Sequence, residues 1–220
     1  MNKLVIWDWN GTLLNDVKAC VDTMNMMLEK RNMQFLTTDR YKNIFTFPVQ
    51  KYYESVGFDF EIDSFEELSV EYIDLYKKEA LKSPLQIGAA ELLEFFKSKG
   101  YSQIILSASE QKSLETQVKQ RNIFEYFDTL LGLNNIHAKS KLNNALDYIN
   151  NSSIETDRIL LIGDTFHDYE VARAIGSECL LVNNGHQNLN QFEFDNPNII
   201  IDDLREVPEL LRNKIYSDRI

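Results

Sequence analysis

The chain has 220 residues, 44% hydrophobic and 26% charged, which is ordinary for a globular protein with a well-buried core. Its formal net charge of −11 disfavours nucleic acid and anionic membrane surfaces as partners. Cys20 and Cys179 show no CxxC spacing, which predicts free buried thiols in a reducing compartment. With no cationic apolar leader and no run of about 18 apolar residues, we expect a cytoplasmic protein.

The first predicted element is a strand over residues 4–7, followed directly by the polar turn of residues 8–12. Four consecutive apolar residues indicate a strand covered on both faces, as in a parallel sheet. Ligands of open α/β sheets bind beyond the carboxyl ends of the strands, which makes Asp8 a candidate functional residue. Gly11 permits a sharp turn, and Thr12 offers a hydroxyl and a backbone N–H to an anion. Taken alone, a strand-end Asp that caps a turn explains this stretch equally well.

Residues 16–82 are predicted to be helical, and this stretch is too long for a single crossover between strands. Helical spacing of apolar residues and N-cap residues predict four helices, over residues 16–33, from 38 onward, over 49–56 and over 65–82. The loop over residues 43–48 carries Phe45 and Phe47. These rings face a cleft or pack among the helices, and the sequence leaves both alternatives open.

The remaining residues alternate between predicted strands and helices, which is typical of a doubly wound parallel sheet. The strands are expected at 101–106, 129–132, 159–162, 179–182 and 198–204, and the helices at 89–99, from 110 onward, at 141–149, 169–175 and 207–215. Ser107, Ala108 and Ser109 follow the second strand, where hydroxyl and N–H groups at a helix start form an anion site. Ser109 is also a plausible N-cap of the next helix.

A second acidic stretch, Gly163-Asp164-Thr165-Phe166-His167-Asp168, follows the predicted strand at 159–162. If this strand pairs with the first one, Asp8 and Asp164 meet at the same edge of the sheet. Converging carboxylates repel each other unless a cation lies between them. Oxygen ligands of this kind predict a hard ion, Mg²⁺ first.

At these two stretches the chain resembles the haloacid dehalogenase-like hydrolase superfamily, in particular its phosphoglycolate phosphatase-like branch. The first motif of that family, Asp-x-Asp-Gly-Thr, is matched by residues 8–12 with Asn10 as the one departure. The fourth motif, Gly-Asp-Ser/Thr-x-x-Asp, is matched in full by residues 163–168. The resemblance implies an α/β fold with a Rossmann-like, mostly parallel core of residues 1–15 and 83–220, and a small all-helical cap of residues 16–82.

The resemblance also implies a Mg²⁺-dependent phosphatase that acts on a small phosphorylated metabolite through an aspartyl-phosphate on Asp8. The metal would be held by Asp8, the main-chain carbonyl of Asn10 and Asp164, with Asp168 as a ligand or as an orienting residue.

The phosphate-binding residues implied by the same resemblance are Thr12, Ser107 with the adjacent Ala108, and a lysine before the helix at 141–149. Lys141 is favoured for the lysine because it stands at the helix start, and Lys139 is the alternative.

Asn10 replaces the carboxylic acid that the family uses to protonate the leaving group. General acid–base catalysis contributes about 10²–10⁴-fold, and an amide does not supply it. The enzyme is therefore slow, or prefers good leaving groups, or takes the proton from His167, His186 or a cap residue. His137 and His186 are otherwise expected to be plain loop residues.

Two other functions stay open at this point. Asn10 also fits a catalytically weak protein that binds a phosphorylated metabolite, and the run at 107–109 resembles a phosphomutase. The sequence does not separate a monomer from a homodimer.

Overall fold

The computed structural model describes residues 3–133, 141–195 and 200–212. Lys139 and His137 lie outside these ranges. Among the described residues, no helix is long and apolar enough to cross a membrane.

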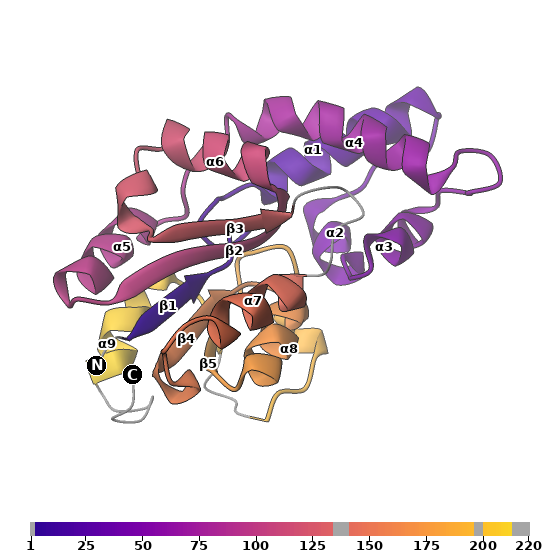
Figure 1. The fold of residues 1–220 in the computed structure, drawn as a ribbon. Coiled ribbons are helices and arrows are strands. Elements are labelled where there is room, and N and C mark those ends of the chain that lie inside the picture. The colour runs from indigo at the N-terminus through magenta and orange to yellow at the C-terminus, as the bar shows by residue number, and fades with distance from the viewer. Residues whose placement is uncertain (1–2, 134–140, 196–199, 213–220) are drawn as a thin grey trace.

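A six-stranded sheet forms the centre of the molecule, and every strand pair in it is parallel (Figure 1). Its strands are β1 (Leu4–Trp7), β2 (Ser102–Glu110), β3 (Thr129–Leu133), β4 (Ile159–Gly163), β5 (Glu178–Val182) and β6 (Ile200–Ile201). Their order is β3-β2-β1-β4-β5-β6, with β1 hydrogen-bonded to both β2 and β4. The strand order therefore reverses at β1, and ligands of doubly wound sheets bind at such a reversal.

Helices cover both faces of the sheet, as the alternating pattern predicts (Figure 1). Val5 and Trp7 face the cluster that contains α5 (Ala89–Ser98), α6 (Gln111–Gln120) and α9 (Val207–Arg212). Leu4 and Ile6 face the cluster of α7 (Lys141–Asn150) and α8 (Phe166–Ile175). Burial of each such side chain contributes about 1.5–3 kcal/mol, which explains why β1 is apolar at every position. The fold is the predicted Rossmann-like α/β fold.

Four helices form a separate group beyond the carboxyl ends of β1 and β2 (Figure 1). They are α1 (Val17–Lys30), α2 (Thr38–Ile44), α3 (Val49–Val56) and α4 (Phe65–Ala80). Their apolar faces make a third hydrophobic cluster, which includes Met24, Met27 and Leu68. This separate cluster supports a cap of residues 16–82, although the exact division of the chain stays a prediction.

The strand β2 extends past the hydroxyl run, with an irregular register between Leu106 and Glu110. The side chain of Glu110 accepts hydrogen bonds from the backbone N–H groups of Lys112 and Ser113 and so caps α6. The interpretation of Ser109 as an N-cap is therefore wrong. Both cysteines are free and buried, as predicted.

Candidate active site

Three buried carboxylates meet where β1 and β4 end. Asp8 follows β1, Asp164 follows β4, and Asp168 lies in the first turn of α8. Each offers an oxygen that lies within 4.8 Å of the others. Since β1 and β4 are paired in register from Leu4 and Ile159 onward, the sheet itself brings Asp8 and Asp164 together.

Lys141 joins this cluster from the first residue of α7. Its ammonium group is 5% exposed and forms ion pairs with Asp8 and Asp168. Burial lowers the pKa of Lys141, but the two carboxylates outweigh burial and hold that pKa above its usual value. The structure thus places one of the two candidate lysines on Asp8, while Lys139 lies outside the described residues.

Asp168 accepts hydrogen bonds from its own loop and from Lys141. Its Oδ2 accepts from the hydroxyl of Thr165 at 2.6 Å and from the backbone N–H of Thr165 at 3.0 Å, and its Oδ1 pairs with Lys141. Burial raises the pKa of Asp168, but Lys141 and Thr165 outweigh burial and lower it. Of the two roles left open for Asp168, this geometry favours orientation of Lys141.

Asp164 is held on both of its oxygens. Oδ1 accepts from the hydroxyl of Thr12 at 3.0 Å, and Oδ2 accepts from the backbone N–H of His186 at 2.6 Å. Burial is the main reason why the pKa of Asp164 is raised, to about 6. Thr12 is wholly buried, and its hydroxyl contacts Asp164, so its role in phosphate binding stays a prediction.

The cluster fits a divalent cation. Three carboxylates face a single ammonium group, so two formal negative charges remain uncompensated. Burial, with Asp168 and Asp164, raises the pKa of Asp8 well above its usual value even though Lys141 opposes the shift. Among the described residues, no donor reaches Oδ2 of Asp8 or the main-chain carbonyl of Asn10. Free oxygen ligands beside Asp164 are the donors that Mg²⁺ prefers.

Asp16 lies on the other side of Asn10, and the sequence analysis missed it as a site residue. It occupies the N-cap position of α1 but makes no capping bond. Its Oδ1 accepts from the backbone N–H of Gly11 at 2.8 Å and pairs with His186 at 3.2 Å. Its Oδ2 accepts from Asn10 and Tyr76. Cys20, Asp16 and His186 lie close enough to hold a metal ion. However, Cys20 and His186 already donate to the carboxylate of Asp16, so this group is better described as a hydrogen-bonded cluster.

His186 is not a plain loop residue, and that prediction is wrong. It is 4% exposed, and its ring lies between Asp16 and the hydroxyl of Tyr41, which is 2.8 Å from Nδ1. Burial lowers the pKa of His186, but Asp16 outweighs burial and raises that pKa to about 9. The feature that could have identified His186 is its position after β5, the strand beside β4. The sequence does not show that position, because it depends on the strand order.

The predicted phosphate-binding serine is buried. Ser107 is 1% exposed, and its hydroxyl accepts from the backbone N–H of Ser109 at 3.0 Å. Ala108 is exposed between them. The hydroxyl of Ser109 donates to Oδ1 of Asn10 at 2.7 Å, so the run at 107–109 borders the site.

The two rings of the loop at 43–48 have different surroundings. Phe45 packs against Tyr41 and His186, with ring centroids 5.3 Å apart in both pairs. Phe47 is half-exposed and reaches the ring of His167 on α8, 5.1 Å away. Phe45 therefore packs among the helices, whereas Phe47 contacts α8 of the core, and a cleft-facing role for either ring stays a prediction.

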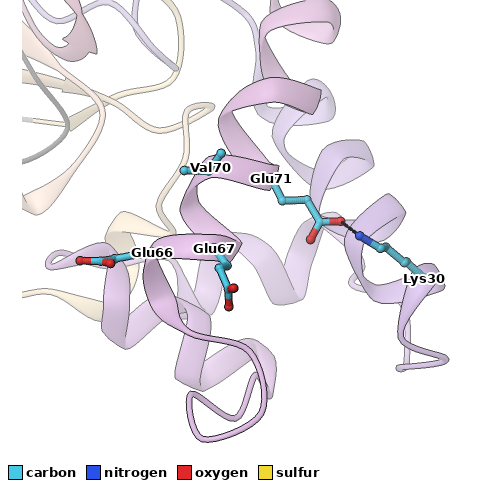
Figure 2. Close-up of a pocket in the computed structure, with 5 residues that line it drawn as sticks. All are labelled: Lys30, Glu66, Glu67, Val70 and Glu71. Carbon is cyan, nitrogen blue, oxygen red and sulfur yellow. Dashed lines mark hydrogen bonds and ion pairs between the residues drawn. The ribbon is translucent and has the colours of Figure 1, made fainter.

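A hollow of about 390 Å³ lies at α1 and α4, and none of the site residues described above lines it (Figure 2). It is lined by Lys30, Glu66, Glu67, Val70 and Glu71. Lys30 pairs with Glu71 at 3.0 Å, and Glu67 closes the capping box of α4. Because three of the five lining residues are glutamates, the hollow disfavours phosphate, and Glu67 and Glu71 already bind groups of α1 and α4. The candidate site is therefore the Asp8 cluster.

Comparison with known proteins identifies the family of the chain. The family model of the haloacid dehalogenase-like hydrolases matches residues 5–182. A Dickeya dadantii (strain 3937) protein named "Probable phosphatase IndB" is 23% identical over 212 residues, 94% of this chain and 92% of that protein. A phosphoglycolate phosphatase of Aquifex aeolicus (strain VF5) is 23% identical over 194 residues, 86% of this chain and 88% of that protein.

A solved structure shares the fold. The haloacid dehalogenase-like family protein SP0104 from Streptococcus pneumoniae superposes with a TM-score of 0.80 at 19% identity, over 96% of this chain and 98% of that one. With the family model spanning most of the chain and the carboxylate cluster at the end of β1 and β4, the chain belongs to the haloacid dehalogenase-like hydrolase family.

Proposed function

We propose that this hydrolase is a Mg²⁺-dependent phosphatase of small phosphomonoesters, with Asp8 as its nucleophile. The observation that carries the proposal is the state of the Asp8 carboxylate. One of its oxygens is paired with Lys141, and the other has no donor among the described residues. The names of the curated relatives support the reaction class, and phosphoglycolate enters as one substrate to test.

In the first step, Oδ2 of Asp8 attacks the phosphorus, an O–P bond forms, and the bond from phosphorus to the leaving oxygen breaks. Lys141 stays beside Asp8 and offsets the negative charge of the phosphoryl group. Bound Mg²⁺, held by Asp8, Asp164 and the carbonyl of Asn10, would supply further charge compensation. Water then attacks the phosphorus of the aspartyl-phosphate, and the bond from phosphorus to Asp8 breaks, which releases inorganic phosphate and returns the Asp8 carboxylate. A proton of the attacking water passes to solvent, and the departed leaving group takes a proton from solvent.

The leaving oxygen receives no proton from Asn10, because an amide is not an acid at neutral pH. Leaving groups that are stable as anions therefore need the least help. We expect acyl and aryl phosphates to turn over faster than alkyl phosphates, by up to the about 10²–10⁴-fold that a general acid contributes.

Access to Asp8 supports a cap function for residues 16–82. Asp8 is only 8% exposed in this arrangement. As a cap, α1–α4 would move away from the carboxyl ends of the strands to admit the substrate and would return to exclude water from the site.

The test is phosphate release from acetyl phosphate, p-nitrophenyl phosphate and 2-phosphoglycolate, with Mg²⁺ and with EDTA. We expect turnover that needs Mg²⁺ and falls by about 10³-fold or more in Asp8→Asn, since that change removes the nucleophile. Asp74→Asn, an exposed change on α4, is the matched control and should keep wild-type rates. Turnover that survives Asp8→Asn would refute the nucleophile.

The engaged amide of Asn10 also favours a second function, a protein that binds a phosphorylated metabolite without turning it over. Calorimetric binding of phosphate that requires Mg²⁺, with no release from any of the three substrates, would support this second function and overturn the first.

A further inference from the structure

The side-chain amide of Asn10 is held by three neighbours. Its Nδ2 donates to Oδ2 of Asp16 at 2.8 Å and to the hydroxyl of Tyr76 at 2.7 Å, and its Oδ1 accepts from Ser109 at 2.7 Å. These bonds engage both the nitrogen and the oxygen of the amide. An ionised carboxylate only accepts hydrogen bonds, so the amide nitrogen must be the end that faces Asp16.

Asp16 holds the same loop at a second point. Besides Asn10, its carboxylate accepts from the backbone N–H of Gly11 at 2.8 Å and from the hydroxyl of Tyr76 at 2.5 Å. Asp16 is completely buried, so water does not replace any of these donors. The carboxylate therefore fixes both the side chain of Asn10 and the backbone that follows it, two residues from Asp8.

A carboxylate does not fit at position 10 while Asp16 stands behind it. Asn10→Asp would place an acceptor oxygen 2.8 Å from Oδ2 of Asp16, where a donor is now found. Two carboxylates at that separation repel each other, and burial removes the water that would screen them. The contact allows one amide and one carboxylate, in either order.

We propose that Asn10 and Asp16 form a reciprocal amide–carboxylate pair, in which Asp16 is the positioning residue that requires an amide at position 10. The predicted effect on kcat rests on the proposed function, because the pair places the loop that flanks Asp8. The predicted effect on stability does not. It also joins the helical group to the site, because Asp16 precedes α1 and Tyr76 belongs to α4.

The experiment is a reciprocal exchange, made with the full chain as Asn10→Asp, Asp16→Asn and the double variant. In the double variant the amide and the carboxylate change places, so the hydrogen bond between positions 10 and 16 again has one donor and one acceptor. Two quantities are measured for each protein: the midpoint of urea unfolding, and kcat and KM for p-nitrophenyl phosphate in saturating Mg²⁺.

We expect each single variant to lose about tenfold or more in kcat and to unfold at lower urea, as coupled contact residues do. The double variant should recover about tenfold over the worse single variant and most of the unfolding midpoint. Losses in the double variant that equal the combined losses of the two single variants would overturn the pair. If a single variant does not fold, a folded double variant supports the pair and an unfolded one refutes it.

Asn25 supplies the matched control. It is a half-buried amide on α1 that donates to the carbonyl of Leu36 at 3.0 Å, away from Asp16. Asn25→Asp should keep the wild-type kcat, and adding Asp16→Asn to it should rescue nothing. Because the unfolding measurement needs no turnover, the pair is tested even if the wild-type protein releases no phosphate, an outcome that would refute only the proposed function.

Discussion

Asp164 is approached so closely from two sides that only glycine fits beside it. A Cβ atom built on Gly11 or on Gly185 would overlap its carboxylate, and one on Gly11 would also lie 2.6 Å from the ring of His186. Gly11 further has a φ of +78°, in the left-handed region that glycine adopts without strain. The two glycines thus allow the backbone to approach the Asp164 carboxylate closely on both sides.

We predict that Gly11→Ala costs both stability and activity. The left-handed φ alone costs about 1–2 kcal/mol, and overlap with Asp164 adds about 1–3 kcal/mol. A displacement of about 1 Å at Asp164 reduces turnover by about 10²-fold. Urea unfolding and kcat for p-nitrophenyl phosphate measure the two effects.

Gly100 is the control, because it shares the left-handed φ, +76°, and has no atom within 4 Å of an added Cβ. Gly100→Ala should cost only the backbone strain and leave kcat unchanged. Equal losses of stability in the two variants would show that the space beside Asp164 does not matter.

Among the elements, the loop that follows β5 connects α8 to the helical group. The side chain of Gln187 accepts from the backbone N–H of Phe166, the first residue of α8, at 2.6 Å and donates to the carbonyl of Phe45 at 2.9 Å. Next to it, Asn188 donates to the carbonyl of Lys42 through its backbone and to Asn43 through its side chain. A buried amide thus joins the helical group to the core.

Gln187→Ala should loosen this junction. The change leaves the N–H of Phe166 without its acceptor, at a cost of about 1–3 kcal/mol. We expect faster hydrogen exchange of the Phe166 amide. Asn188→Ala removes two exposed bonds, one to Asn43 and one from the backbone N–H of Asn190, and should leave hydrogen exchange of the Phe166 amide unchanged. Unchanged exchange at Phe166 in Gln187→Ala would contradict this role.

For the whole molecule, the net charge of −11 opposes the approach of a phosphate dianion. Salt screens this repulsion over about 10 Å at 0.1 M, while the buried groups around Asp8 are screened less. In saturating Mg²⁺, kcat/KM for 2-phosphoglycolate should therefore rise about two- to threefold between about 20 and 200 mM NaCl. Phosphocholine, which carries a compensating positive charge, should show a weaker dependence. A fall in kcat/KM for 2-phosphoglycolate would indicate a local basic surface stronger than the overall charge.

At the scale of the whole molecule, the alternation of strands and helices was predictable from the sequence. Parallel strands buried on both faces are apolar at every position, which distinguishes them from the amphipathic helices between them. The runs at 4–7 and 159–162 became β1 and β4, and the Asp that follows each run became part of the carboxylate cluster. The family was predictable as well, because its motifs are local in sequence, and the family model that matches residues 5–182 confirms it.

The sequence by itself determined the α/β class, the family and the residues that its motifs name, all of which depend on local patterns. Only the tertiary structure decided what surrounds Asn10. Asp16 was only the first residue of a predicted helix and His186 a residue of a predicted loop, yet they pair across 170 positions of the chain at 3.2 Å. No local pattern encodes such a contact, because it exists only after the sheet has placed β5 beside β4 and the helices have packed over both.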